Sequence, residues 1–171
     1  MISTRLYWID GPWPGKLAMA ARPRGGDWLD SEMAGWRRAN VDTVFSLLTP
    51  AEEADLGLEA EEETAKSHGL RFLRFSIPDR QVPDSEVAFS RALEELEAEL
   101  EADRNVVLHC RQGLGRTGIA AACLLITKGA TPEAALRQLS MIRGVTLPET
   151  SEQRQWIDRY AVLAAISGYL E

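Results

Sequence analysis

The chain has 171 residues, 45% of them hydrophobic, so it can bury one sizeable core and we expect a single domain. Its 19 Lys and Arg residues against 26 Asp and Glu residues give a formal net charge of −7, which argues against nucleic acid and anionic membranes as partners. The apolar run at 119–126 is far shorter than the ~20 residues that span a bilayer, and the two cysteines provide no disulfide framework, so we expect a monomer in the reducing cytoplasm.

The first part of the chain contains two clusters of proline and glycine, at 11–15 and 23–26, which predict turns before the regular part begins. Residues 44–48 are typical of a buried strand. The segment Thr49-Pro50-Ala51-Glu52 combines a capping threonine, proline at the first helical position and a glutamate that completes a capping box. We therefore expect an acidic helix from there to about His68.

Strands and helices continue to alternate through the rest of the chain. Residues 70–77 alternate as a strand does, and a loop at 78–83 leads to a helix from about Ser85 to Ala102. Residues 105–109 form a short apolar strand. Three further helices are predicted after it: one over residues 116–128, one that begins at Thr131-Pro132, and one over residues 151–168. The pattern predicts a three-layer α/β domain, in which helices flank a mostly parallel sheet of about four to five strands and ligands bind at the carboxyl ends of the strands.

The segment with the clearest chemistry lies at such a carboxyl end and reads His109-Cys110-Arg111-Gln112-Gly113-Leu114-Gly115-Arg116-Thr117-Gly118. Its glycines allow unusual backbone dihedrals, so successive N–H groups can point inward as a nest for an anion at a helix N-terminus. We expect this loop to bind phosphate through Arg111, Gln112, Gly113, Leu114, Gly115 and Arg116.

Cys110 is the expected nucleophile of this loop. Helix N-termini and nearby cations favour the thiolate form of a cysteine. A bound phosphoryl group would place its phosphorus beside the sulfur while Arg116 holds two equatorial oxygens, and displacement would give a phosphocysteine. Thr117 could donate its hydroxyl to the sulfur and improve it as a leaving group, or it could serve only as a residue of the first helical turn.

The segment matches the Cys-x5-Arg signature of protein tyrosine and dual-specificity phosphatases, and the wider sequence resembles the kinase-associated phosphatase branch of that superfamily. The resemblance covers roughly residues 40–160 and implies a phosphatase that needs no metal or cofactor. It also implies that His109 supports the loop and tunes the thiolate. By the same resemblance, residues 1–40 form an N-terminal sheet and recognition segment, and residues 41–171 form the catalytic core.

Two aspartates could protonate the leaving group, which departs poorly as an alkoxide or phenoxide. The family pattern places the acid directly after Ile77-Pro78, which is Asp79. Asp84 is the alternative, although it also fits the N-cap of the following helix.

The hydrolytic water needs a partner, and related enzymes use a glutamine at the start of a late helix. Gln153 is the best match and Gln155 the alternative. Gln153 also fits a capping box that begins at Thr150, so both roles stay open.

The charge of the loop bears on the substrate. Arg111 is its only cation besides Arg116, so we favour phosphorylated protein side chains, while inositol and sugar phosphates stay open as small phosphomonoesters. One rival is a module of the same fold that binds phosphoproteins without turnover, and another is a sulfur-transfer or arsenate-reducing enzyme. The second rival lacks a well-placed second thiol, because Cys123 lies about two helical turns beyond the loop and is expected to pack in the core.

Overall fold

A five-stranded sheet forms the centre of the fold in the computed structural model, which describes residues 3–170. The strand order is β1-β2-β5-β3-β4. β1 is antiparallel to β2, and all other neighbours are parallel. The strands are β1 (Tyr7–Ile9), β2 (Leu17–Ala20), β3 (Thr43–Ser46), β4 (Arg71–Arg74) and β5 (Val106–His109).

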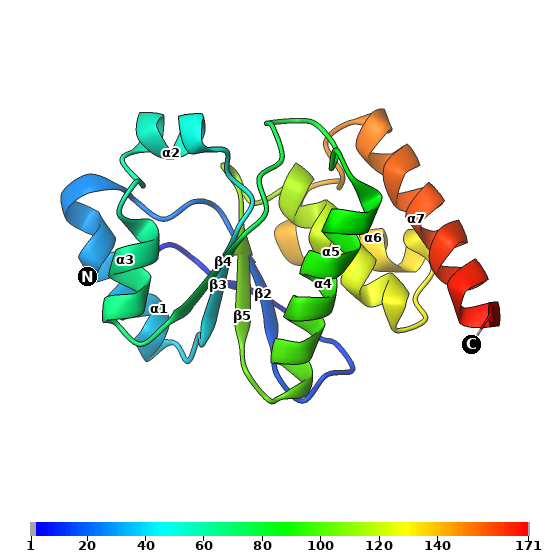
Figure 1. The fold of residues 1–171 in the computed structure, drawn as a ribbon, viewed down its shortest axis with the longest axis horizontal. Helices are drawn as coiled ribbons and strands as arrows, with labels where there is room; N and C mark the ends of the chain where they lie inside the picture. Colours follow the sequence, from blue (N-terminus) through cyan, green and yellow to red (C-terminus); the bar gives the residue numbers. More distant parts are fainter. Residues whose placement is uncertain (1–2, 171) are drawn as a thin grey trace.

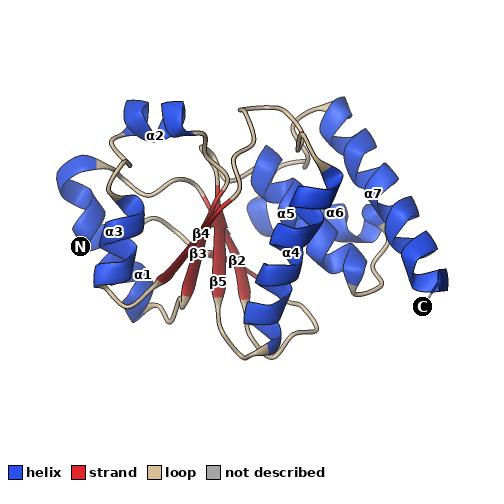
Figure 2. Ribbon diagram, in the orientation of Figure 1, coloured by secondary structure: helices blue, strands red, loops and turns tan. Residues whose placement is uncertain are grey.

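Helices cover both faces of this sheet (Figures 1 and 2). α1 and α3 lie on one face, α4, α5 and α6 lie on the other, and α7 packs on the outer side of α5. The helices are α1 (Leu29–Arg38), α2 (Pro50–Leu56), α3 (Glu61–Ser67), α4 (Glu86–Glu101), α5 (Gly115–Thr127), α6 (Pro132–Arg143) and α7 (Ser151–Leu170), with a short 3-10 helix at Gly26–Trp28. The predicted α/β fold with a mostly parallel sheet is confirmed.

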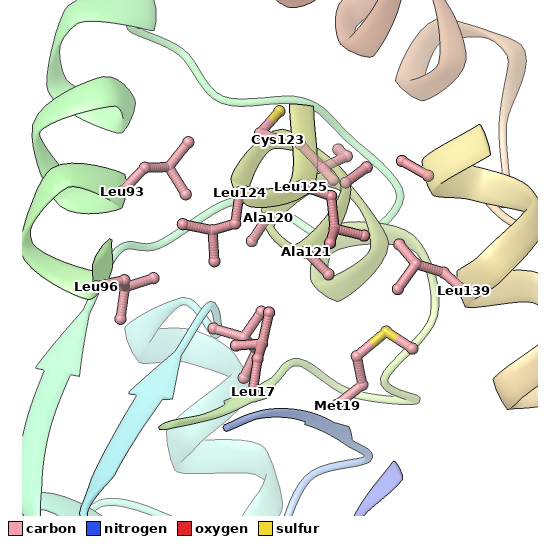
Figure 3. Packing of buried hydrophobic residues seen from close by; sticks show 14 of the residues in the cluster. Leu17, Met19, Leu93, Leu96, Ala120, Ala121, Cys123, Leu124, Leu125 and Leu139 are labelled. Carbon is pink, nitrogen blue, oxygen red and sulfur yellow. The ribbon is translucent and has the colours of Figure 1, made fainter. Parts of the chain in front are cut away.

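α5 is the most buried helix, and its small residues explain why. Ala120 and Ala121 are fully buried and let the helix lie close to Leu17 and Met19 of β2 (Figure 3). Cys123 is also fully buried in this core, where burial raises the pKa of its thiol well above the ordinary value. The expectation that Cys123 packs in the core is confirmed.

Several local expectations were wrong. The Pro/Gly clusters placed the start of the regular part too late, because β1 and β2, within the segment for which the resemblance implies a sheet, flank the first cluster and α1 follows the second. The acidic helix is two helices, since Gly57 ends α2 in the left-handed conformation with φ 67°. The N-cap of α4 is Ser85, whose side chain accepts a hydrogen bond from the Ala88 amide, and not Asp84.

The sheet topology brings three loops to one edge. The carboxyl ends of β3, β4 and β5 lie side by side, since Ser46 pairs with both Arg74 and His109. The loop after β3 leads into α2, the loop after β4 carries Asp79, and the loop after β5 carries Cys110. Over residues 3–170, no helix is long and apolar enough to cross a bilayer.

Candidate active site

The loop between β5 and α5 forms the floor of the site. Cys110 follows the central strand directly and is 2% exposed. Gly113 has φ 72°, and a β-carbon there would lie 2.3 Å from the carbonyl oxygen of Ala20, so only glycine fits. α5 then begins at Gly115 without a side-chain cap at Leu114, which leaves the start of a buried helix suited to an anion.

Thr117 lies against the sulfur of Cys110. Its hydroxyl donates a hydrogen bond to Sγ at 3.0 Å, and its side chain is fully buried. The first turn of α5 therefore brings together the predicted nucleophile and the hydroxyl that could stabilise it as a leaving group.

Arg116 is 2% exposed, and helix α2 and the loop after β4 hold its guanidinium. Nη1 donates to Glu52 at 2.6 Å and to the Ile77 carbonyl at 2.7 Å, while Nη2 donates to Glu52 at 2.9 Å and to Asp79 at 3.1 Å. Burial alone would lower the pKa of Arg116, but its hydrogen bonds to Glu52 and the charges of Cys110, Glu52 and Asp79 raise it. Nε has no hydrogen-bond partner among the described residues. A phosphoryl group could therefore accept one hydrogen bond from Nε and, in place of Asp79, a second one from Nη2.

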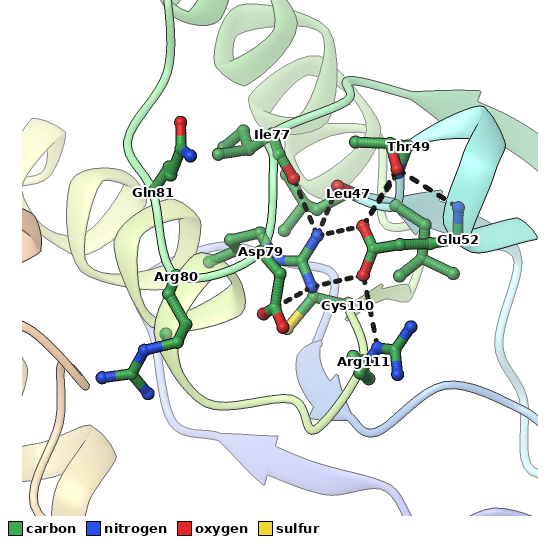
Figure 4. A network of polar contacts seen from close by, with 12 residues as sticks. Leu47, Thr49, Glu52, Ile77, Asp79, Arg80, Gln81, Cys110 and Arg111 are labelled. Carbon is green, nitrogen blue, oxygen red and sulfur yellow. Dashed lines mark hydrogen bonds and ion pairs between the residues drawn. The ribbon is translucent and has the colours of Figure 1, made fainter.

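Glu52 is a site residue that the sequence reasoning did not single out. Its carboxylate closes the capping box at Thr49 (Figure 4) and also accepts two hydrogen bonds from Arg116. Burial would raise the pKa of Glu52, but hydrogen bonds from Arg116 and from the Thr49 backbone lower it to about 2 from its ordinary 4.5. Glu52 is therefore an anion that fixes the orientation of the arginine.

Of the two candidate acids, the structure brings Asp79 to the site. Its Oδ1 lies 3.1 Å from Arg116 Nη2, and its side chain is 51% exposed. Asp84 is exposed at the start of α4 and makes no contact with Arg116.

Gln153 lies close to the phosphate loop, but its side chain is largely engaged. Oε1 accepts hydrogen bonds from the amides of Glu149 and Thr150, and Nε2 donates to the carbonyl of Gln81 at 3.2 Å. Its own amide donates to Thr150 Oγ1, which completes the capping box of α7. One N–H of the buried side-chain amide is left for another partner.

His109 lies behind the loop in a buried pair. Its Nε2 is 2.5 Å from Oε2 of Glu61, and both side chains are fully buried. The other ring nitrogen lies 3.3 Å from the Cys110 carbonyl, and the His109 and Trp36 ring centroids are 6.0 Å apart. The pair joins α3 to the strand that carries the nucleophile.

The remaining predicted loop residues line the rim. Arg111 Nε is 3.5 Å from Glu52, and the Gln112 carbonyl accepts a hydrogen bond from Arg143 at 3.0 Å. The Arg143 guanidinium stacks on the ring of Tyr7, 3.9 Å from its centroid, so β1 helps to hold the loop. No group of three His, Cys, Asp or Glu side chains within residues 3–170 is arranged to hold a metal ion.

Comparison with known proteins identifies the class. The family described as "Tc-R-P: Polymorphic toxin system, DSP-PTPase phosphatase" matches residues 19–130, which include the phosphate loop. The chain belongs to this family of DSP-PTPase phosphatases. The expected resemblance to dual-specificity and tyrosine phosphatases is confirmed.

Individual relatives agree with this class. The chain is 28% identical to cyclin-dependent kinase inhibitor 3 from Sus scrofa over 126 residues, which cover 72% of this chain and 59% of the relative. It is 34% identical to inositol diphosphatase DSP1 from Oryza sativa subsp. japonica over 67 residues, 39% of this chain and 30% of that protein. The chain thus spans under two thirds of the length of these relatives.

A solved structure shares the fold over nearly the whole chain. Kinase-associated phosphatase, crystallised with its catalytic-site cysteine replaced by serine, superposes with a TM-score of 0.85 at 21% identity and covers 95% of this chain and 96% of its own. This likeness shows that the two chains share a fold.

Proposed function

We propose that the protein is a cysteine-dependent phosphatase that hydrolyses phosphomonoesters through a phosphocysteine intermediate. The observation that carries the proposal is the convergence of Cys110, Thr117, Arg116 and Asp79 at one helix start. A module that only binds phosphate has no need for an acid facing the arginine or for a hydroxyl on the sulfur. The second rival, sulfur transfer or arsenate reduction with a resolving thiol, is disfavoured because Cys123 is fully buried in the core.

In the first step the Cys110 thiolate attacks phosphorus, an S–P bond forms and the bond from phosphorus to the ester oxygen breaks. The departing oxygen takes a proton from Asp79. Arg116 holds the equatorial oxygens through Nε and Nη2, while Glu52 keeps the guanidinium in place.

In the second step a water molecule attacks phosphorus, the S–P bond breaks and the sulfur leaves as a thiolate held by the Thr117 hydroxyl. The Asp79 carboxylate takes the proton of the water, which restores the acid. Gln153 positions this water through the second N–H of its side-chain amide, which makes no bond to the backbone.

The substrates are phosphorylated protein side chains, on tyrosine or with dual specificity for serine, threonine and tyrosine. Support comes from the modest charge of the loop and from a similar fold, Pseudomonas aeruginosa TpbA, solved in complex with phosphotyrosine (TM-score 0.57, 22% identity, 89% of this chain and 86% of that chain). Inositol or sugar phosphates are the second candidate, favoured by the similarity to inositol diphosphatase DSP1.

The proposal also covers the oligomeric state, the location and the division of the chain into two segments. The protein acts as a monomer in the cytoplasm, where the buried thiols of Cys110 and Cys123 stay reduced. Residues 1–40 serve as the recognition segment, in which Trp8 and Trp28 expose their rings, and residues 41–171 serve as the catalytic core.

Turnover of 4-nitrophenyl phosphate by the wild type, Cys110→Ser and Asp79→Asn tests the chemistry. We expect Cys110→Ser to be inactive and Asp79→Asn to be slowed most with poor leaving groups. Equal background rates for wild type and Cys110→Ser would favour the binding module, and a leaving-group effect in Asp84→Asn alone would make Asp84 the acid. A panel of phosphopeptides, inositol phosphates and sugar phosphates then distinguishes the substrate classes.

A further inference from the structure

The loop that carries Asp79 is a tight turn with an unusual backbone. The Gln81 amide donates to the Pro78 carbonyl at 3.0 Å, and Arg80 at the third position of this turn has φ 64°. Glycine is the residue usually found in this conformation, since a β-carbon makes it unfavourable. An arginine there calls for a compensating contact of its side chain.

The side chain of Arg80 makes such a contact. It turns away from Cys110 (Figure 4), and Nη1 donates to Oε2 of Glu149 at 3.0 Å. The other oxygen of the same carboxylate accepts the Gly115 amide, at the start of α5, at 2.9 Å. Glu149 therefore links the loop of the acid directly to the phosphate loop.

The side chain of Asp79 itself is held less firmly than that of Arg80. Asp79 contacts Arg116 only through the Nη2 hydrogen that a bound phosphoryl group would take. Once a substrate occupies the site, the Asp79 carboxylate must leave that hydrogen and face the departing oxygen. Besides the bond from Arg116 to the Ile77 carbonyl at the base of the loop, the contacts that then hold it are Arg80 to Glu149 and the Gln81 carbonyl to Gln153.

We propose that Arg80 and Glu149 are positioning residues, whose ion pair holds the Asp79 loop over the bound phosphoryl group while Asp79 protonates the leaving group. The proposal rests on Asp79 being the acid. Neither residue touches the reacting atoms. They therefore affect the rate only of steps in which Asp79 must be correctly positioned. The effect on the rate is largest for poor leaving groups, which depend most on protonation by Asp79.

The test compares kcat/KM for phenyl phosphate, a poor leaving group, with that for 4-nitrophenyl phosphate, a good one. Both esters carry the same phosphate, so the ratio of the two values cancels changes in phosphate binding. Arg80→Ala keeps the β-carbon and hence the cost of the backbone conformation, and Glu149→Gln keeps an acceptor for the Gly115 amide. We expect each variant to lower the ratio about fivefold, and the double variant to lower it no further than either single one.

Arg159→Ala is the matched control, because Arg159 pairs with Glu86 of α4, not with the Asp79 turn or the phosphate loop, and is 62% exposed, as Arg80 is. It should leave the ratio unchanged. An unchanged ratio in Arg80→Ala and Glu149→Gln, with a lowered ratio in Asp79→Asn, would overturn the positioning role alone. An unchanged ratio in Asp79→Asn would overturn the acid itself. A loss in Glu149→Gln without one in Arg80→Ala would show that the carboxylate acts independently of the ion pair, which also overturns the proposal.

Discussion

The carboxylate of Glu52 and the guanidinium of Arg116 meet in two hydrogen bonds, of 2.6 and 2.9 Å, although 64 positions separate them in the chain. Burial raises the pKa of Glu52, but its hydrogen bonds to Arg116 and to Thr49 outweigh this and lower it from 4.5 to about 2, so the folded state binds fewer protons than the unfolded state between these values. The pair therefore stabilises the protein above about pH 4.5, and this contribution is lost as the pH falls towards 2.

We predict that Glu52→Gln removes this pH dependence. At pH 7 the variant should lose about 3 kcal/mol of unfolding free energy, the equivalent of the shift in pKa from 4.5 to about 2. Near pH 2 it should unfold much as the wild type does. Urea denaturation across this range measures both values.

Glu59→Gln is the control for this prediction, since Glu59 is exposed just after α2 and its side chain makes no hydrogen bond or ion pair with the residues that the structure describes. It should follow the wild type at every pH. A Glu52→Gln curve that runs parallel to the wild type through acid would show that the pair with Arg116 does not set the acid stability.

We predict that Thr117→Val slows the breakdown of the phosphocysteine more than its formation. Valine keeps the shape of the side chain but removes the hydroxyl that donates to the sulfur at 3.0 Å. Losing one hydrogen bond to a developing charge should lower kcat about tenfold, with little change in kcat/KM. Rapid mixing should then show a larger burst of 4-nitrophenol, while Thr117→Ser behaves like the wild type. Equal loss in kcat and kcat/KM would place the hydroxyl in the first step instead.

Much of the fold and the centre of the site could be predicted because their signals are local. The glycine-rich segment after a buried strand predicted the phosphate loop, and the capping pattern at Thr49 predicted the start of α2. Sequence patterns were less informative for short strands, which are stabilised mainly by pairing with neighbouring strands. β1 and β2 have only three and four residues and are held by pairing in the sheet, so their signal was lost on either side of the first Pro/Gly cluster.

The carboxylates around the loop show the second limit of the sequence. Glu52 already had a local explanation as part of a capping box, and Glu61 stood within a run of three glutamates. Only the parallel order of β3, β4 and β5 brings these residues to the phosphate loop. Glu149 was likewise hidden, because its partners Arg80 and Gly115 lie 69 and 34 positions away.

The buried pair of Glu61 and His109 gives a third prediction. Both side chains are fully buried, and Oε1 of Glu61 has no hydrogen-bond partner among the described residues. Removing the carboxylate leaves the buried His109 ring nitrogen without its hydrogen-bond partner, so Glu61→Ala should cost about 3 kcal/mol of unfolding free energy. Glu63→Ala, at an exposed residue in the same turn of α3, should cost almost nothing. Equal stability of the two variants in urea would show that the contact behind Cys110 is not stabilising.

A fourth prediction separates backbone strain from lack of space in the phosphate loop. Gly113 and Gly144 have nearly the same dihedral, φ 72° and 74°, but a β-carbon at Gly113 would meet the Ala20 carbonyl oxygen at 2.3 Å, whereas one at Gly144 would meet nothing within 4 Å. Gly144→Ala should therefore cost only the left-handed conformation, about 1 kcal/mol. Gly113→Ala must also move the loop away from β2, so we expect about 3 kcal/mol or more.

Phosphate binding and turnover should also differ between Gly113→Ala and Gly144→Ala. Moving the loop turns its amides away from the bound anion, so Gly113→Ala should lose competitive inhibition by inorganic phosphate as well as turnover, while Gly144→Ala keeps both. The two unfolding curves and the two inhibition constants are measured side by side. Equal costs at the two glycines would mean that β2 yields to the added methyl group, and the close approach of Ala20 to Gly113 would then not be what fixes the phosphate loop.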